Sequence, residues 1–279
     1  TQKITLMRTE VSYNHVANWS DALLAQGRYG FALSELKEKT HELSDAAIKL
    51  ALKRLAGKGK LLSVFKGYYL VIPPQYAAKG ILPPPLYLDA FMKHLKRPYY
   101  VGLLNAAAFH GASHQQPQEY FVMTGFPVLR PTQKKGLKIN YISVKEIPEP
   151  LIEKRKTEAG YLNVSNAALT ACDLIQYEKR IGGMNRAATV LNELAEAIKP
   201  TDFSSTLLRH VHVTALQRLG YLLESVCFNQ ELANALFQAM EKAKLSFYRI
   251  PLKPSKDTKG YSSENRWKVI VNTEMEIDE

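Results

Sequence analysis

Lysines and arginines recur at short intervals between residues 45 and 66. If residues 45–57 form a helix, Lys49 and Lys53 lie one turn apart on the same side. The opposite side is then an apolar stripe that would pack on neighbouring helices, formed by Ile48, Ala51, Leu52 and Leu55. A narrow apolar stripe, a basic outer side and small residues near the N-terminal end suit a helix that enters the DNA major groove, which is about 12 Å wide.

The basic side chains would neutralise phosphates and bond to guanine acceptors, and Ser44 would meet the backbone or the bases at the tip of the helix. Leu50 is the apolar exception on the basic side, and it either contacts a thymine methyl group or widens the core stripe. A solvated helix face is the alternative interpretation of the helical cations. The residues that we predict to bind DNA are Ser44, Lys49, Lys53, Arg54, Lys58, Lys60 and Lys66.

Three helices and a hairpin are predicted to position this basic surface. Residues 14–26 are expected to form the first helix, and Ser34 is expected to cap the second. Ser44 caps the third helix, which ends at the glycines of the segment GKGK. The runs LLSVF and YYLVI follow, separated by Lys66-Gly67, a dipeptide typical of a hairpin turn. This order predicts a winged helix-turn-helix.

Charge and composition agree with a polyanionic partner. The 279 residues carry a formal net charge of +11. Residues 1–83 hold 12 Lys and Arg against 6 Asp and Glu, whereas residues 84–279 hold 25 against 20, so the excess is densest around the predicted winged helix. The two cysteines, Cys172 and Cys227, lie in apolar contexts and are expected to be buried thiols. We find no signal peptide, membrane-spanning run or lipidation motif, and therefore expect a soluble cytoplasmic protein.

A proline-rich stretch around residues 73–85 predicts a domain boundary, since it suits neither regular helix nor central strand. We assign residues 1–84 to the winged helix and residues 85–279 to a C-terminal domain, with room for two subdomains. The fold class expected is α+β, with a mixed, mainly helical C-terminal region that contains a small sheet. In the C-terminal region, the first two predicted helices are residues 85–96 and 99–111, and residues 166–244 are predicted to be mostly helical. The predicted strands are residues 119–125, 137–144, 161–165, 247–252 and 266–272. Residues 3–8 are expected to form an edge strand.

The sequence offers no recognisable active site. It lacks a phosphate-binding loop, a nucleophile elbow and a paired-histidine zinc motif. His210 and His212 would share one face of a strand, yet no acidic or cysteine cluster accompanies them. The single Glu-x-Lys, at residues 35–37, belongs to the predicted helix-turn-helix rather than to a nuclease strand. We therefore expect no catalytic residue, no metal site and no cofactor.

The segment after the linker resembles a known family. Its pattern is Tyr-Tyr-Val-Gly, then Ala-Ala, then His-Gly before a Gln-rich loop and a strand. Together with residues 165–195, this order resembles the AbiEi antitoxins, regulators of bacterial phage-defence operons of the abortive-infection type. The residues that carry the likeness are Tyr99, Tyr100, Gly102, Ala106, Ala107, His110 and Gly111. Packing in a core helix also explains the first of these segments, with His110 hydrogen-bonded at its end.

The resemblance implies a winged helix that represses its own promoter at inverted repeats in double-stranded DNA. It also implies a C-terminal domain that counters a nucleotidyltransferase-like toxin, directly or indirectly. Two alternatives stay open: a sequence-specific nuclease with an accessory helix-turn-helix, and a transcription factor that senses a small ligand.

Overall fold

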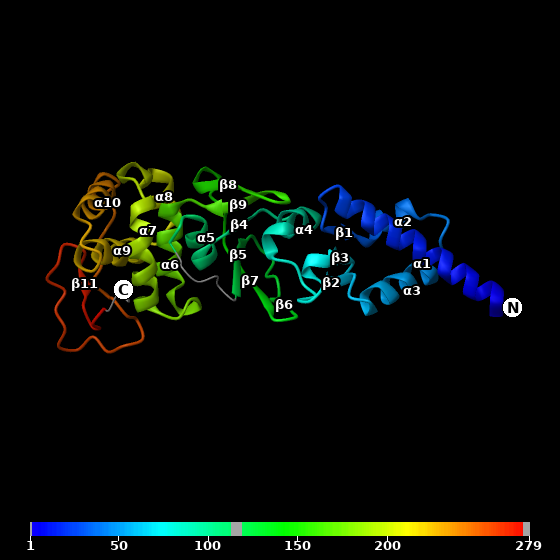
Figure 1. The fold of residues 1–279 in the computed structure, drawn as a ribbon. Helices are drawn as coiled ribbons and strands as arrows, with labels where there is room; N and C mark the ends of the chain where they lie inside the picture. Colours follow the sequence, from blue (N-terminus) through cyan, green and yellow to red (C-terminus); the bar gives the residue numbers. More distant parts are fainter. Residues whose placement is uncertain (1, 113–118, 276–279) are drawn as a thin grey trace.

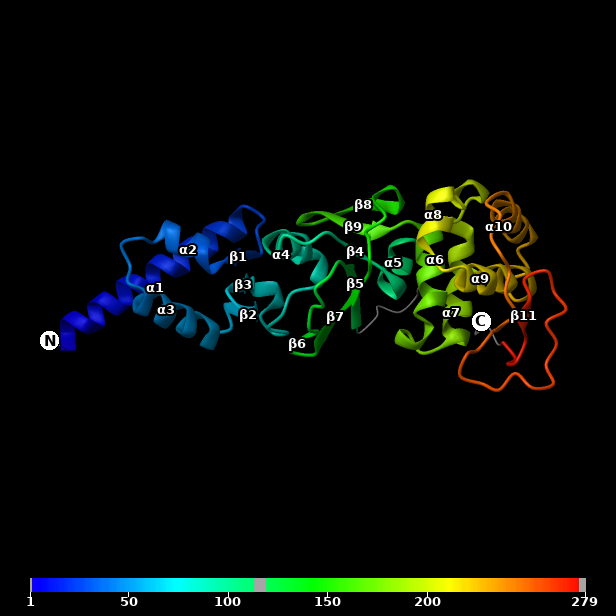
Figure 2. The same cartoon turned by 180° about the vertical axis from the view of Figure 1, so that it is seen from behind.

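The computed structural model describes residues 2–112 and 119–275, with side chains from residue 12 onward. The molecule is a row of three parts, with the winged helix at one end, a sheet in the middle and a helical part at the other end (Figures 1 and 2). No helix in the described ranges is long and apolar enough to cross a membrane.

The N-terminal part has winged-helix topology, because β1 pairs with β3 and β3 pairs with β2, both antiparallel. Its core lies between the three helices and one face of this sheet, around Phe31, Leu36 and Leu55. The elements are α1 (Gln2–Ala25), β1 (Gly30–Ala32), α2 (Leu33–Lys39), α3 (Asp45–Gly57), β2 (Leu61–Phe65) and β3 (Tyr68–Val71).

Two local expectations are wrong. Residues 3–8 belong to α1 and not to an edge strand, since no proline or glycine interrupts the segment before Gly27. Ser34 lies inside α2, whose N-cap is Ala32 without a side-chain bond. The chain enters α2 directly from β1, and the Leu33 N–H donates to the Gly67 carbonyl at 2.8 Å, so no serine cap is needed there.

The third helix forms as its sequence predicts. The Ser44 hydroxyl accepts the Ala47 N–H at 3.3 Å, and Asp45 adds a negative charge in the first turn. The chain turns away at Gly59, whose φ of 70° is left-handed. The apolar stripe packs against α1 and is buried, as predicted, at Ile48, Ala51, Leu52 and Leu55.

The middle part is a six-stranded mixed sheet in the order β6-β7-β5-β4-β9-β8. Successive side chains of a strand face opposite sides, so Tyr100 and Met123 join the core of the helical part, whereas Tyr99 and Val122 face the winged helix. The strands are β4 (Tyr99–Val101), β5 (Glu119–Thr124), β6 (Thr132–Lys134), β7 (Leu137–Ser143), β8 (Ile152–Thr157) and β9 (Gly160–Ser165).

The helix predicted over residues 99–111 is half strand. Residues 99–101 pair with β5 on one side and β9 on the other, and only residues 103–109 form α5. Leu103 has a φ of 54°, which turns the chain sharply between the two elements. Three β-forming residues in succession outweigh a helical pattern that is only two turns long. The polar edge strand β8 was not predicted, because IEKRKT lacks an apolar alternation.

The C-terminal part is helical, as expected, and ends in one short parallel pair, β10 with β11. His210 is the last residue of α8 and His212 precedes the first residue of α9, so the two histidines do not share a strand face. The remaining helices are α4 (Leu88–His94), α5 (Leu103–Phe109), α6 (Ala167–Gln176), α7 (Met184–Leu194), α8 (Ser205–His210), α9 (Val213–Ser225) and α10 (Gln230–Lys242), and the last strands are β10 (Ile250–Pro251) and β11 (Val269–Ile270).

One apolar cluster joins the wing to the sheet. Tyr68 of β3 is 2% exposed, and its ring centroid lies 5.2 Å from that of Phe91 in α4. Leu70 of β3 and Val164 of β9 belong to the same buried cluster. The wing is therefore packed on the middle part and is not a free appendage.

The contact between Gly220 and Trp267 gives a stability prediction. A Cβ on Gly220 of α9 would lie 2.2 Å from the indole ring of Trp267, which is fully buried. Gly220→Ala should lower the free energy of unfolding by about 3 kcal/mol, because the ring has to move within a packed core. Urea denaturation measures this decrease.

Gly57 is the matched control, since no heavy atom lies within 4 Å of a Cβ placed there. Gly57→Ala should leave the free energy of unfolding unchanged or raise it by up to about 1 kcal/mol. Equal midpoints for the two variants would contradict the packing described.

Candidate nucleic-acid interface and antitoxin motif

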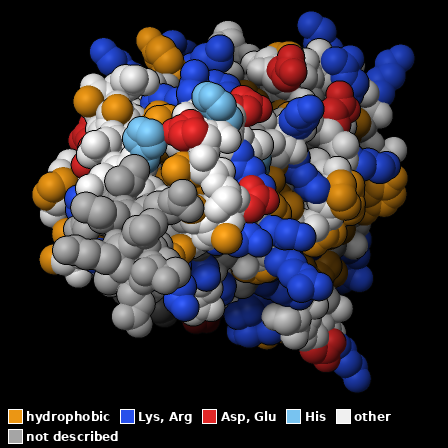
Figure 3. Space-filling model, turned by 90° about the vertical axis from the view of Figure 1, so that its right-hand side faces the viewer, with side chains coloured by type: hydrophobic (Ala, Val, Ile, Leu, Met, Phe, Trp, Pro, Cys, Tyr) orange, Lys and Arg blue, Asp and Glu red, His pale blue; other side chains and the backbone are white. Residues whose placement is uncertain are grey.

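The outer face of α3 is basic and exposed. Lys49, Lys53 and Arg54 are exposed on the side opposite the buried stripe. Leu50 is 38% exposed among them, so it does not widen the core stripe. Seen from the winged-helix end, Lys and Arg side chains gather below the centre of the molecule (Figure 3). A helix of this kind can place cations at phosphates and one methyl-bearing side chain at bases.

Most of the predicted cations are free to meet phosphates. Within the described part of the chain, no acidic side chain pairs with Lys49, Lys53, Arg54, Lys60 or Lys66. Lys58 differs, because its Nζ bonds to the Tyr13 hydroxyl at 3.1 Å and lies 4.4 Å from the centre of that ring. Lys58 thus ties the end of α3 to α1.

The start of α3 carries a carboxylate whose charge is compensated by a lysine. Asp45 lies in the first turn, where a free carboxylate would repel a phosphate backbone. Lys37 of α2 bonds to this carboxylate at 2.8 Å, and the bond lowers the pKa of Asp45. The pair spans the helix-turn-helix and leaves the tip of α3 without net charge from these two residues. Lys37 and Tyr13 were missed from the sequence, since contacts between helices follow no single helical period.

The wing is a short hairpin. A two-residue turn, Lys66-Gly67, joins β2 to β3, with a φ of 78° at Gly67. Phe65 before the turn lies 5.6 Å from Phe91 of α4, centroid to centroid. Lys66 is therefore at the end of β2 that faces α4, whereas Lys60 precedes the other end. Of the predicted DNA-contacting residues, the structure gathers Ser44, Lys49, Lys53 and Arg54 on α3 and sets Lys66 apart.

Side chains of the antitoxin-like motif make hydrogen bonds that hold elements of the fold together. His110 caps the C-terminal end of α5, and its Nε2 lies 2.8 Å from the Ser165 carbonyl oxygen of β9. Arg155 of β8 lies 2.9 Å from the other ring nitrogen, Nδ1. With both ring nitrogens engaged, His110 joins α5 to two strands. The predicted hydrogen-bonded role of His110 is confirmed.

Tyr100 of the motif meets a buried acid. Its hydroxyl donates to Asp173 Oδ2 of α6 at 3.1 Å, which ties the sheet to the helical part. Burial raises the pKa of Asp173 to about 8, and the bond from Tyr100 opposes part of that rise. Asp173 is therefore largely protonated at neutral pH, which spares the core a buried charge.

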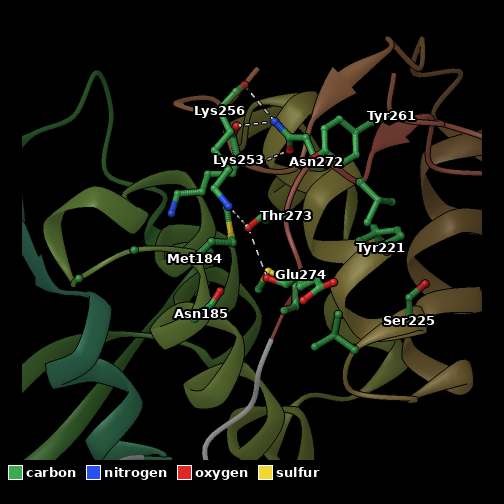
Figure 4. A pocket seen from close by; sticks show the side chains of 15 residues that line it. Met184, Asn185, Tyr221, Ser225, Lys253, Lys256, Tyr261, Asn272, Thr273 and Glu274 are labelled. Carbon is green, nitrogen blue, oxygen red and sulfur yellow. Dashed lines mark hydrogen bonds between the residues drawn. The ribbon is translucent and has the colours of Figure 1, made fainter. Parts of the chain in front are cut away.

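A cavity of about 1030 Å³ lies between the start of α7, α9 and the C-terminal segment (Figure 4). The Asn272 amide donates to the carbonyls of Lys253 and Lys256 at 2.9 and 3.1 Å, and Lys256 Nζ donates to Thr273 at 3.0 Å. These bonds hold the wall of the cavity together. No group of three His, Cys, Asp or Glu that could hold a metal ion occurs among the described residues. The wall of the cavity formed by residues 253–256 and 272–273 is therefore held by hydrogen bonds.

Residues 100–225 match the family model of the AbiEi antitoxin C-terminal domain. This region is similar to the C-terminal domain of the AbiEi antitoxins, and we refer to it as the antitoxin domain. This antitoxin domain covers the sheet from β4 onward and the helices to α9, and it includes the hydrogen-bonded residues His110 and Asp173.

A solved structure, the crystal structure of RV2827C protein from Mycobacterium tuberculosis, is similar over 93% of this chain and 91% of that one, with 16% sequence identity and a TM-score of 0.65. At this identity the likeness supports the fold alone. The comparison with curated proteins gives no match.

The ion pair at the tip of α3 predicts a loss of DNA affinity. In the DNA contact that we propose below, Lys37→Ala should weaken binding a few-fold at low salt, because Asp45 would then face phosphates uncompensated. Adding Asp45→Asn should restore the affinity. Fluorescence anisotropy measures both.

Lys39→Ala is the control, since Lys39 is exposed on the same helix without an ion pair to any described residue. The charge-compensating role of Lys37 is wrong if both single variants bind equally, or if Asp45→Asn gives no rescue.

The buried acid predicts a pH dependence. Between pH 4 and 8 the native state keeps the Asp173 proton, whereas the unfolded chain, with the ordinary pKa of 3.8, loses it. Stability therefore falls as the pH rises, by at most about 1.4 kcal/mol per pH unit from this group. Asp173→Asn keeps the acceptor for Tyr100 and should remove that slope. Urea midpoints measured from pH 5 to 8 for both proteins test it; parallel curves would refute the protonated state.

Proposed function

We propose that the protein is a non-enzymatic antitoxin that represses its own operon through the winged helix and counters a nucleotidyltransferase-like toxin through its C-terminal domain. The observation that carries the DNA-binding part is the unpaired basic face of α3. Phosphates can reach such cations without first displacing an ion-pair partner, and the release of counterions from the DNA favours the contact. The antitoxin part is supported by the family match over residues 100–225.

The residues proposed to contact DNA divide into three groups. Lys49, Lys53 and Arg54 lie on α3 and reach phosphates and base edges, with Leu50 between them as the side chain for a thymine methyl group. Ser44 keeps its capping bond and presents the helix tip. Lys60 and Lys66 bind phosphates at opposite ends of β2, whereas Lys58, held by Tyr13, contributes mainly to the position of α3.

Reversing two charges on α3 tests the proposal. Lys53→Glu with Arg54→Glu should abolish promoter binding in a gel shift and leave the thermal melt nearly unchanged, because both side chains are exposed and unpaired. A milder change, Lys53→Ala, removes one cation and should reduce the salt slope of binding by about one. Lys154→Glu with Lys156→Glu, on the polar edge strand β8, makes the same charge change as the double variant away from the winged helix and should bind normally.

The same variants separate the two activities in cells that express the toxin. The α3 double variant should still rescue growth, since the antitoxin domain is intact. Full-length variants suit this experiment better than a fragment of residues 84–279, because the wing and the sheet share one core. Unaltered promoter binding by the α3 variant would show that its basic face is not the DNA-contacting surface. Loss of rescue by the folded variant would argue against two separate activities.

A further inference from the structure

A second cavity lies at the junction between the wing and the sheet, away from the outer face of α3. Its volume is about 420 Å³, within the range of small-molecule sites. The linker after the wing forms one side, and α5 and the sheet form the others. Most of its walls are apolar, and they include Ile81, Pro83, Ala108, Phe109 and Leu137.

Two buried polar side chains belong to these walls. Asn105 is 4% exposed; its amide nitrogen donates to the Glu119 carbonyl at 3.2 Å, and its oxygen accepts the Phe121 N–H at 2.8 Å. An amide has two N–H donors, so one is left for a ligand. Tyr120 is 7% exposed, and its hydroxyl finds no hydrogen-bond partner among the described residues. An unmet buried polar group of this kind costs about 1–3 kcal/mol.

The rim of the cavity is positively charged. Lys79 lines it, and the Lys135 side chain packs over Gly80, where a Cβ would lie 2.9 Å from Nζ. Neither lysine pairs with an acidic side chain in the described ranges. The ammonium group of Lys79 at the cavity wall, with that of Lys135 beside the adjoining Gly80, attracts an anion whose body is apolar.

We propose that this cavity binds a small amphipathic anion, with a hydrocarbon or aromatic body between the linker and α5 and an acidic group at Lys79 and Lys135. The site needs neither DNA nor toxin, so it stands or falls independently of the function proposed above. Its walls come from the linker and from the antitoxin domain, so a bound anion contacts both at once.

Dye binding to the full-length protein tests the site. Anilinonaphthalene sulfonate, an aromatic body with one anionic group, should bind saturably with increased fluorescence, and decanoate should displace it. Ala108→Trp fills the cavity from an exposed position of α5 and should abolish binding. Lys79→Glu should weaken it about fivefold or more. Lys154→Glu is the control with the same charge change on β8 and should bind as the unaltered protein does.

The thermal melt of each variant shows whether it is folded. If Ala108→Trp does not fold, Lys79→Glu still tests the site. The proposal is overturned if the unaltered protein shows no saturable binding, or if Lys79→Glu binds as tightly as Lys154→Glu. Self-association that Ala108→Trp abolishes would assign the cavity to a second copy of the chain, which also overturns it.

Discussion

The packing of Tyr68 on α4 is the contact on which the arrangement of the molecule depends. Its ring lies between the winged-helix sheet and Phe91, and its centroid is 5.0 Å from that of His94. A Cβ on Gly30 of β1 would lie 2.7 Å from its hydroxyl oxygen, so only glycine fits beside it. This one side chain therefore fixes β1 against β3 and the wing against the antitoxin domain, and through them the direction of α3.

Charge is distributed in two ways around that packed centre. Where a charge would disturb a binding face or a core, it is compensated or avoided. Lys37 pairs with Asp45 at the helix tip, and burial keeps Asp173 protonated in the core. Lys49 and Lys53, by contrast, stay unpaired on the outer face of α3. The fold thus neutralises the charges of Asp45 and Asp173, and it leaves the lysines of α3 available to a polyanion.

Local signals in the sequence predicted the winged helix well. The cap at Ser44, the apolar stripe of α3 and the turn at Lys66-Gly67 each depend on residues close together in the chain. Predictions from the sequence were wrong or incomplete where the structure of a segment depends on residues far away in the chain. Tyr99 and Tyr100 become strand because β5 and β9 lie on either side of them, and Lys37 reaches Asp45 across a turn. The likeness to the antitoxin family came from a motif whose side chains mostly fasten the fold, so it identified the domain without indicating a contact surface.

The linear order of the three parts has a consequence for the operon control that we propose. The winged helix and the bundle of α7, α9 and α10 lie at opposite poles of the molecule (Figures 1 and 2). A partner held at the far pole does not obstruct a duplex held at the near one. Release from DNA by such a partner would therefore need a mechanical route through the shared core around Tyr68 and not competition for space. The packing of that core would then determine how strongly binding at one end of the molecule changes binding at the other.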